Sequence, residues 1–134
     1  MMPEPPPDGQ IMAPISPGEL VDKITILEIK SEQITDTSKK ANVDRELELL
    51  RAIQRRHVDA TDYLRDCERE LSEINRKLWV IEDDLRLMEK NQDFGEKFVA
   101  LARLVYITND QRFRVKRKIN TAMASAIFEE KSHA

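Results

Sequence analysis

Glycine, cysteine and aromatic residues are scarce in this chain, and their scarcity excludes several kinds of fold. Only 3 of the 134 residues are glycine, and only 5% are aromatic. That leaves too few turn residues for a β-sandwich, a β-barrel or a nucleotide-binding α/β fold. The single cysteine, Cys67, cannot form an internal disulfide, so no oxidising compartment is required. What remains is a helix-rich domain.

Long apolar runs are also missing. No stretch approaches the roughly 18 consecutive apolar residues of a membrane span, so we expect none. The first residues show no basic segment followed by an apolar core, which predicts no signal peptide and, by default, a cytoplasmic protein. The net charge is -3, which argues against nucleic acid as a partner. We therefore expect the basic run Arg112–Lys118 to be solvated or paired with an acidic helix.

Proline placement predicts where the folded part begins. All six prolines lie within the first 17 residues, so residues 1–12 are expected to form a Pro-rich flexible tail and residues 13–132 a single helical domain. Ser16 is a good N-cap, Pro17 suits the first helical position, and Glu19 completes a capping box. The sequence therefore predicts a first helix over residues 17–34.

This first helix is apolar on more than one side, which requires more than one neighbour. We expect it to lie wedged between helices or at a subunit contact. In a three-helix monomer one apolar side of this helix would remain exposed to solvent. This predicts a homo-oligomer, unless the central helix breaks and folds back over that side. Its apolar positions are Leu20, Val21, Ile24, Ile26, Leu27, Ile29 and Ile34.

The stretch from Lys39 to Phe94 contains neither glycine nor proline and carries a coiled-coil seam. The seam is weakest around residues 57–61, where polar residues offer two helix caps. One helix of about 50 residues and two helices separated by a break near 57–61 both fit this pattern. The seam positions are Leu50, Ile53, His57, Ala60, Leu64, Cys67, Leu71, Ile74, Leu78, Ile81, Leu85 and Met88.

After a turn at residues 91–95, a last helix is expected to run back beside the central one. The fold class is therefore all-α: an antiparallel helical bundle or coiled coil of three long helices, or four if the central helix breaks. The last helix has its own seam, Phe98, Leu101, Val105, Thr108, Arg112, Val115, Ile119, Ala122 and Ala126. Folding about the turn pairs Leu85 with Leu101, Ile81 with Val105, Leu78 with Thr108, Ile74 with Arg112, and Leu71 with Val115.

Arg112 occupies a seam position where an apolar side chain is expected, and a buried arginine needs a partner. In this register the nearest acids of the facing helix are Glu70 and Glu73, and Asn75 would join the same layer. Such a layer either fixes the helix register or forms a small ligand pocket. The candidate ligand-binding residues are Glu19, Asp22, Asn75, Trp79, Tyr106, Asn109, Asp110 and Arg112.

Acidic pairs raise the question of magnesium, which prefers oxygen ligands. Glu19 and Asp22 are three residues apart, and a second acidic group follows Trp79 at Glu82–Asp84. These pairs show a faint similarity to all-helical Mg²⁺-dependent nucleotide pyrophosphohydrolases. However, 35% of the residues are charged, and such pairs arise by chance at that density. We therefore predict no metal site and no cofactor, assign no catalytic residue, and leave enzymatic activity open.

Several longer motifs carry a resemblance to a known family. They are Ile15–Lys30 (ISPGELVDKITILEIK), Leu78–Asp84 (LWVIEDD), Asp93-Phe94, Leu101–Tyr106 (LARLVY), Asn109-Asp110, Lys118–Asn120 and Glu129–Ser132. They resemble a family of small all-helical bacterial proteins catalogued only as a domain of unknown function. The resemblance covers residues 13–132. It implies a bacterial cytosolic protein that accompanies glycosyltransferases of surface-polysaccharide assembly.

Two functions remain open from the sequence. The first is a non-enzymatic protein-interaction or scaffold module that self-associates or binds a protein partner. The alternative is a small all-α enzyme or ligand binder, with a polar site near Trp79 and Asn109, that could depend on Mg²⁺ and act on phosphorylated substrates.

Overall fold

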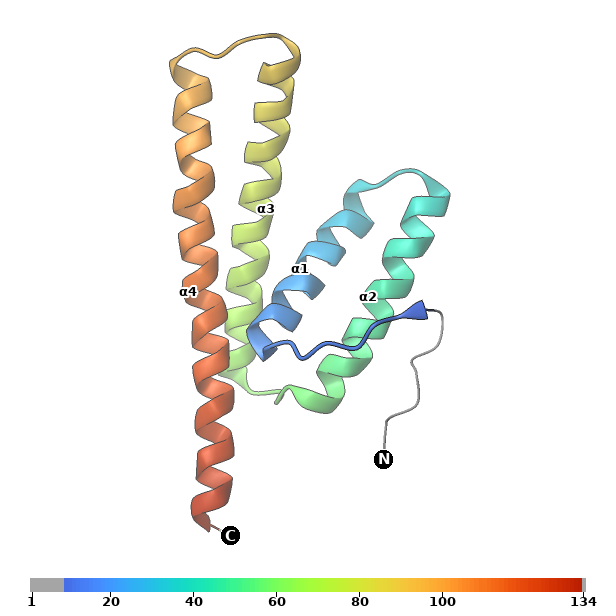
Figure 1. Cartoon of the computed structure of the whole chain (residues 1–134), viewed down its shortest axis with the longest axis vertical. Helices are drawn as coiled ribbons and strands as arrows, with labels where there is room; N and C mark the ends of the chain where they lie inside the picture. Colours follow the sequence, from blue (N-terminus) through green and yellow to red (C-terminus); the bar gives the residue numbers. More distant parts are fainter. Residues whose placement is uncertain (1–8, 134) are drawn as a thin grey trace.

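In the computed structural model, the described part of the chain forms four helices, arranged as in Figure 1. The structure describes the backbone of residues 9–133 and the side chains of residues 9–124, and no strand occurs in this part of the chain. The all-α prediction is confirmed, with the four-helix alternative. In chain order the helices are α1 (Pro17–Gln33), α2 (Thr37–His57), α3 (Asp62–Lys90) and α4 (Glu96–His133).

α1 begins where the sequence predicts. The Ser16 side chain accepts a hydrogen bond from the Glu19 backbone N–H at 3.1 Å, and Pro17 occupies the first turn. The Glu19 carboxylate does not close a capping box in this structure, because it accepts from Lys116 of α4. α1 packs against α2, α3 and α4, which confirms that its apolar surface is wedged between other helices.

The central stretch is broken at residues 58–61, which confirms the second of the two alternatives that the sequence left open. Val58 has an extended backbone (φ -112°, ψ 126°) and ends α2, while the Thr61 side chain caps α3 by accepting from the Leu64 N–H at 3.1 Å. The chain reverses between these points, so that α2 folds back against α1 (Figure 1). α2 therefore covers the side of α1 that a three-helix monomer would have left wet.

α3 and α4 form the long antiparallel hairpin that the sequence predicts (Figure 1). Their buried seam residues share one core with Val21 of α1, and Val105 packs against that core from α4. The pairing of Leu85 with Leu101 stays a prediction, since both side chains are half-buried. The core comprises Val21, Leu64, Cys67, Leu71, Ile74, Leu78, Val115 and Ile119.

Some predictions concern parts of the chain outside this description. Residues 1–8 of the tail and the side chain of Ala126 in the α4 seam lie there. Residues 10–16 of the described part contain no helix. Among the described residues, none of the helices has both the length and the apolar character needed to cross a membrane.

Candidate functional site

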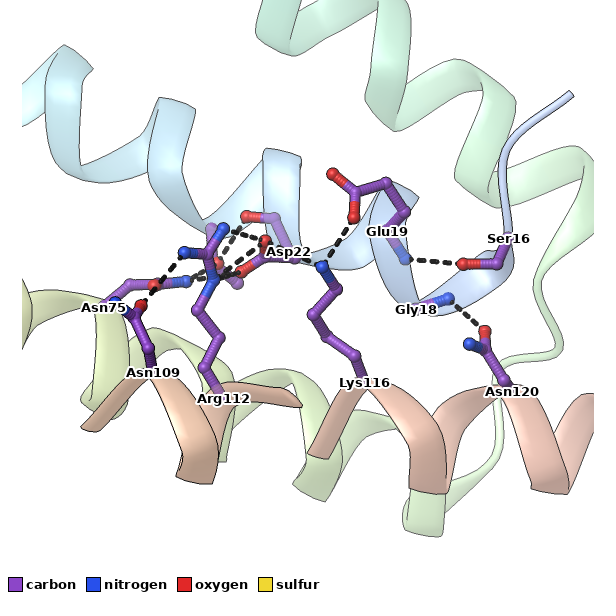
Figure 2. Close-up of polar contacts among 10 residues, drawn as sticks. Ser16, Gly18, Glu19, Asp22, Asn75, Asn109, Arg112, Lys116 and Asn120 are labelled. Atoms are coloured by element: carbon purple, nitrogen blue, oxygen red, sulfur yellow. Dashed lines mark hydrogen bonds and ion pairs between the residues drawn. The ribbon is translucent and has the colours of Figure 1, made fainter. Parts of the chain in front are cut away.

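A buried carboxylate joins three of the four helices. Asp22 on α1 is fully buried and accepts hydrogen bonds from the Arg112 guanidinium of α4, with Nε at 2.9 Å from Oδ1 and 3.0 Å from Oδ2. Asn75 on α3 donates to Asp22 Oδ1 and to the Thr25 hydroxyl, each at 2.9 Å. Figure 2 shows the Asp22, Asn75 and Arg112 side chains converging between the helices. We call Asp22, Thr25, Asn75 and Arg112 the polar layer.

Hydrogen bonds from Arg112 and Asn75 satisfy the Asp22 carboxylate within the polar layer. The Thr25 hydroxyl donates to the Asp22 backbone carbonyl at 2.8 Å. The hydrogen bonds to Asp22 raise the pKa of Arg112 above its already high ordinary value, and burial opposes this shift only in part. The arginine therefore stays charged, as a buried carboxylate requires of its partner.

Two further contacts bind the first turns of α1 to α4 (Figure 2). Lys116 forms an ion pair with Glu19 and lies 3.7 Å from an Asp22 oxygen. The Gly18 N–H donates to the Asn120 side-chain oxygen at 2.8 Å. A Cβ at Gly18 would lie 2.5 Å from the Lys116 carbonyl oxygen, so only glycine allows the helices to approach this closely.

A second polar network connects α1, α2 and α3. Arg51 of α2 forms an ion pair with Glu28 and lies 3.5 Å from Glu68 of α3. Gln54 donates a hydrogen bond to Glu68. Burial raises the pKa of Glu28, although Arg51 lowers it in part. α2 is thus held to its neighbours partly through charged groups.

Beside the polar layer, lined by residues of α1, α3 and α4, lies a cleft of about 340 Å³. We call it the Trp79 cleft. Ile26, Ile29, Leu78 and Trp79 supply its apolar wall. Charged and polar groups complete the lining, namely Lys30, Asn75, Glu82, Asp83, Arg86 and Arg112.

The structure brings together part of the predicted site. Asp22, Asn75 and Arg112 are joined by hydrogen bonds, and Glu19 lies one helical turn from Asp22. The Asn109 oxygen lies at 3.5 Å from Arg112 Nη1, the limit of a hydrogen bond. Trp79 joins Asn75 and Arg112 in lining the cleft.

Tyr106 and Asp110 are exposed and lie outside the polar layer. The predicted partner of Arg112 was wrong, because Arg112 binds Asp22 of α1 rather than an acid of α3. Glu70 instead lies 3.5 Å from Lys118 of α4, and Glu73 is exposed.

Sequence reasoning missed the role of Thr25 and, apart from Trp79, the apolar wall of the cleft. A usable signal existed: Asp22 is flanked by the apolar residues Val21 and Ile24 on a helix that must be buried on several sides. Such a carboxylate needs a buried cation. The Mg²⁺ interpretation of Glu19 and Asp22 gains no support, since both carboxylates accept from cations of α4. The described residues contain no group of three or more His, Cys, Asp or Glu that could hold a metal ion.

Fold and site together define an all-helical bundle. Its first helix, α1, is held against the α3–α4 hairpin by the buried contacts of Asp22 with Asn75 and Arg112. The chain belongs to the family described as "Family of unknown function (DUF6165)", whose model matches residues 11–134. No curated protein and no solved structure matches it.

Proposed function

We propose that this protein is a non-enzymatic helical interaction module, which receives an amphipathic helix of a partner protein in the Trp79 cleft. The observation that carries the proposal is the composition of the cleft: an apolar wall bordered by charges of both signs. This is the pattern of a surface that accepts a helix, with apolar side chains on the floor and charged pairs along the rim.

The position of the cleft supports this proposal. α1 packs against both α3 and α4 and serves as their third helix at the level of Asn75 and Arg112. Farther along α3, Glu82, Asp83 and Arg86 are exposed, and the hairpin extends well past the end of α1 (Figure 1). A partner helix seated there would cover the part of the hairpin that α1 leaves open.

α4 supplies a further surface. Val99, Tyr106 and Phe113 are 52%, 55% and 64% exposed, and their seven-residue spacing puts them on one face of the helix. Exposed apolar side chains that share one face of a helix favour a contact there. This row would extend a binding interface along the hairpin.

The cellular context that the family resemblance implies gives the proposal a direction. Bacterial glycosyltransferases of surface-polysaccharide assembly are the first partners to test, and the cytoplasm is the proposed place of contact.

Site-specific photo-crosslinking in the producing cell tests the proposal. A photoreactive phenylalanine analogue replaces Trp79 in one variant. In the control it replaces Val80, the next residue of α3, which is 58% exposed and does not line the cleft. We expect one discrete protein to be captured from position 79 and much less of it from position 80. Equal capture from both positions, no capture, or capture only of further copies of this chain contradicts the proposal.

One feature favours a second candidate, a binder of small anions. Arg112 is anchored through Nε and Nη2, whereas the partner of its Nη1 among the described residues is the Asn109 oxygen at 3.5 Å. Lys30 and Arg86 line the same cleft. Thermal-shift screening with carboxylate and phosphate compounds tests this. Stabilisation that is lost in both Lys30→Ala and Arg86→Ala supports it, and the absence of any stabilising compound refutes it.

A further inference from the structure

α2 makes fewer contacts with the other described helices than any of them makes. It contains no buried residue, and its backbone packs closely against α1 alone. The connection between α1 and α2 spans only residues 34–36. A link this short keeps two antiparallel helices side by side, so α1 and α2 behave as one hairpin, attached to α3 through residues 58–61.

The sequence of this attachment also suits a helix. Residues 58–61 contain neither glycine nor proline, and the coiled-coil spacing runs through them without a slip. In a continuous helix every seam residue would lie on one face. In the structure the seam is interrupted, since Ile53 is half-buried, His57 and Ala60 are exposed, and Leu64 is buried. The sequence of residues 58–61 thus fits a continuous helix, although the single chain bends there.

We propose that two copies of this chain exchange their α1–α2 hairpins, residues 17–57, by straightening residues 58–61 into helix. α2 and α3 then form one helix of roughly 80 Å from Thr37 to Lys90. The α1 of each copy lies in the α3–α4 groove of the other. The contacts of Asp22 with Arg112 and of Gly18 with Asn120 re-form between copies, so the exchange keeps the packing that holds α1.

The directions of the helices allow such a dimer to close. In one copy α1 points the same way along the hairpin as α3, and α2 points the opposite way (Figure 1). When residues 58–61 straighten, α2 points in the same direction as the α3 of its own chain, and α1, which stays antiparallel to α2, points in the opposite direction. Because α1 packs parallel to the α3 that it contacts, the α3 of the second copy must run antiparallel to the α3 of the first. Two copies related by a twofold axis near residues 58–61 have their α3 helices antiparallel in this way. Exchange about a twofold axis is also a closed arrangement. The C-terminal turns of α4 also extend past the beginning of α3, beside the path of a straightened α2 (Figure 1).

A proline at position 62 distinguishes the bent monomer from the exchanged dimer, because it is compatible with only one of them. Asp62 is the first residue of α3, and the preceding Thr61 has φ -89° and ψ 158°. This is nearly the geometry of Ser16 (φ -75°, ψ 156°), which already precedes Pro17 at the start of α1. Asp62→Pro therefore fits the bent chain, but it would break a continuous helix by removing a backbone donor and by steric clash.

Light scattering on chains refolded at high concentration measures the effect. We expect wild type to contain a dimer fraction that Asp62→Pro abolishes. Asp62→Ala, which also loses the exposed ion pair with Arg65, should retain it. Thr61→Ala removes the α3 cap and should increase it. Equal dimer fractions in Asp62→Pro and Asp62→Ala, or no dimer in either wild type or Thr61→Ala, overturn the proposal.

Charge reversal distinguishes exchange from side-by-side association. Glu32 of α1 accepts two hydrogen bonds from Arg76 of α3, at 2.6 and 2.9 Å, and both side chains are about half exposed. In Glu32→Arg and in Arg76→Glu this contact is repulsive within a monomer or homodimer. In an exchanged heterodimer, the α1 of the Glu32→Arg chain packs on the α3 of the Arg76→Glu chain. The unchanged Glu32 and Arg76 meet at the other contact, so both contacts pair opposite charges.

The two variants are refolded together, one of them isotope-labelled, and counted by native mass spectrometry. We expect heterodimers to exceed their statistical share, whereas a statistical distribution overturns the exchange. The proposal stands apart from the proposed function. Asp62→Pro leaves the residues of the Trp79 cleft unchanged, so crosslinking from position 79 is tested in that variant independently.

Discussion

The Asp22–Arg112 pair gives the sharpest stability prediction. Arg112→Met keeps much of the aliphatic stem but leaves the fully buried Asp22 with Asn75 and with Lys116 at 3.7 Å. Removing one partner of a buried ion pair typically costs about 3–5 kcal/mol. The Arg112 side chain is 28% exposed and Lys116 remains nearby, so we lower the expected loss in unfolding free energy to about 2–4 kcal/mol.

A second substitution shows that the cost arises from the stranded charge. Adding Asp22→Asn to Arg112→Met removes the uncompensated carboxylate, so the double variant should be more stable than Arg112→Met alone. Urea unfolding at neutral pH, followed by far-UV circular dichroism, measures both differences. Arg114→Met, an exposed substitution on the same helix, is the control and should stay within about 0.5 kcal/mol of wild type.

Two results would refute this reasoning. One is an Arg112→Met variant as stable as the Arg114→Met control, which would mean that Asp22 does not depend on the arginine. The other is a double variant no more stable than Arg112→Met alone, which would mean that the uncompensated Asp22 carboxylate is not the source of the loss.

Three further predictions concern single positions. Gly18→Ala should destabilise by about 1–3 kcal/mol, the usual cost of overpacking, whereas Gly95→Ala, whose Cβ would meet its nearest atom at 3.5 Å, should change stability little; urea unfolding compares the two. Thr108→Val should raise stability by about 1 kcal/mol, because the buried Thr108 hydroxyl has no hydrogen-bond partner among the described residues, and a lower melting temperature would contradict this. The raised pKa of Glu28 means that the folded state holds this proton more tightly, so wild type should lose stability relative to Glu28→Gln as pH rises from about 4.5. Parallel stability curves for wild type and Glu28→Gln would refute this sign.

The sequence predicts the local structure well because local signals decide it. Ser16 and Pro17 identify the start of α1, and the turn at residues 91–95 separates α3 from α4. The unusual position of Arg112 also indicates a polar layer that includes Asn75. These features depend on capping, spacing and the requirement that a buried charge be paired, and each can be evaluated from a few neighbouring residues.

The arrangement of α1 could not be predicted in the same way. Pairing α3 with α4 alone points Arg112 toward acids of α3, whereas the acid that binds it comes from a helix 90 positions earlier in the chain. The break after α2 is equally hard to predict, since the Thr61 cap competes with an unbroken heptad pattern. The difference is decided by whether α2 covers α1, which is a tertiary contact.

The fluorescence of Trp79 tests the proposed function most directly, since it is the only tryptophan of the chain and lines the cleft. The protein captured by crosslinking, or the helix of it that was captured, is prepared without tryptophan and titrated against this chain. If a helix enters the Trp79 cleft, the emission should shift to shorter wavelength and saturate with binding, because the indole loses contact with water. Binding confirmed by a second method with no change in the Trp79 emission would show that the partner docks elsewhere, and would contradict the account.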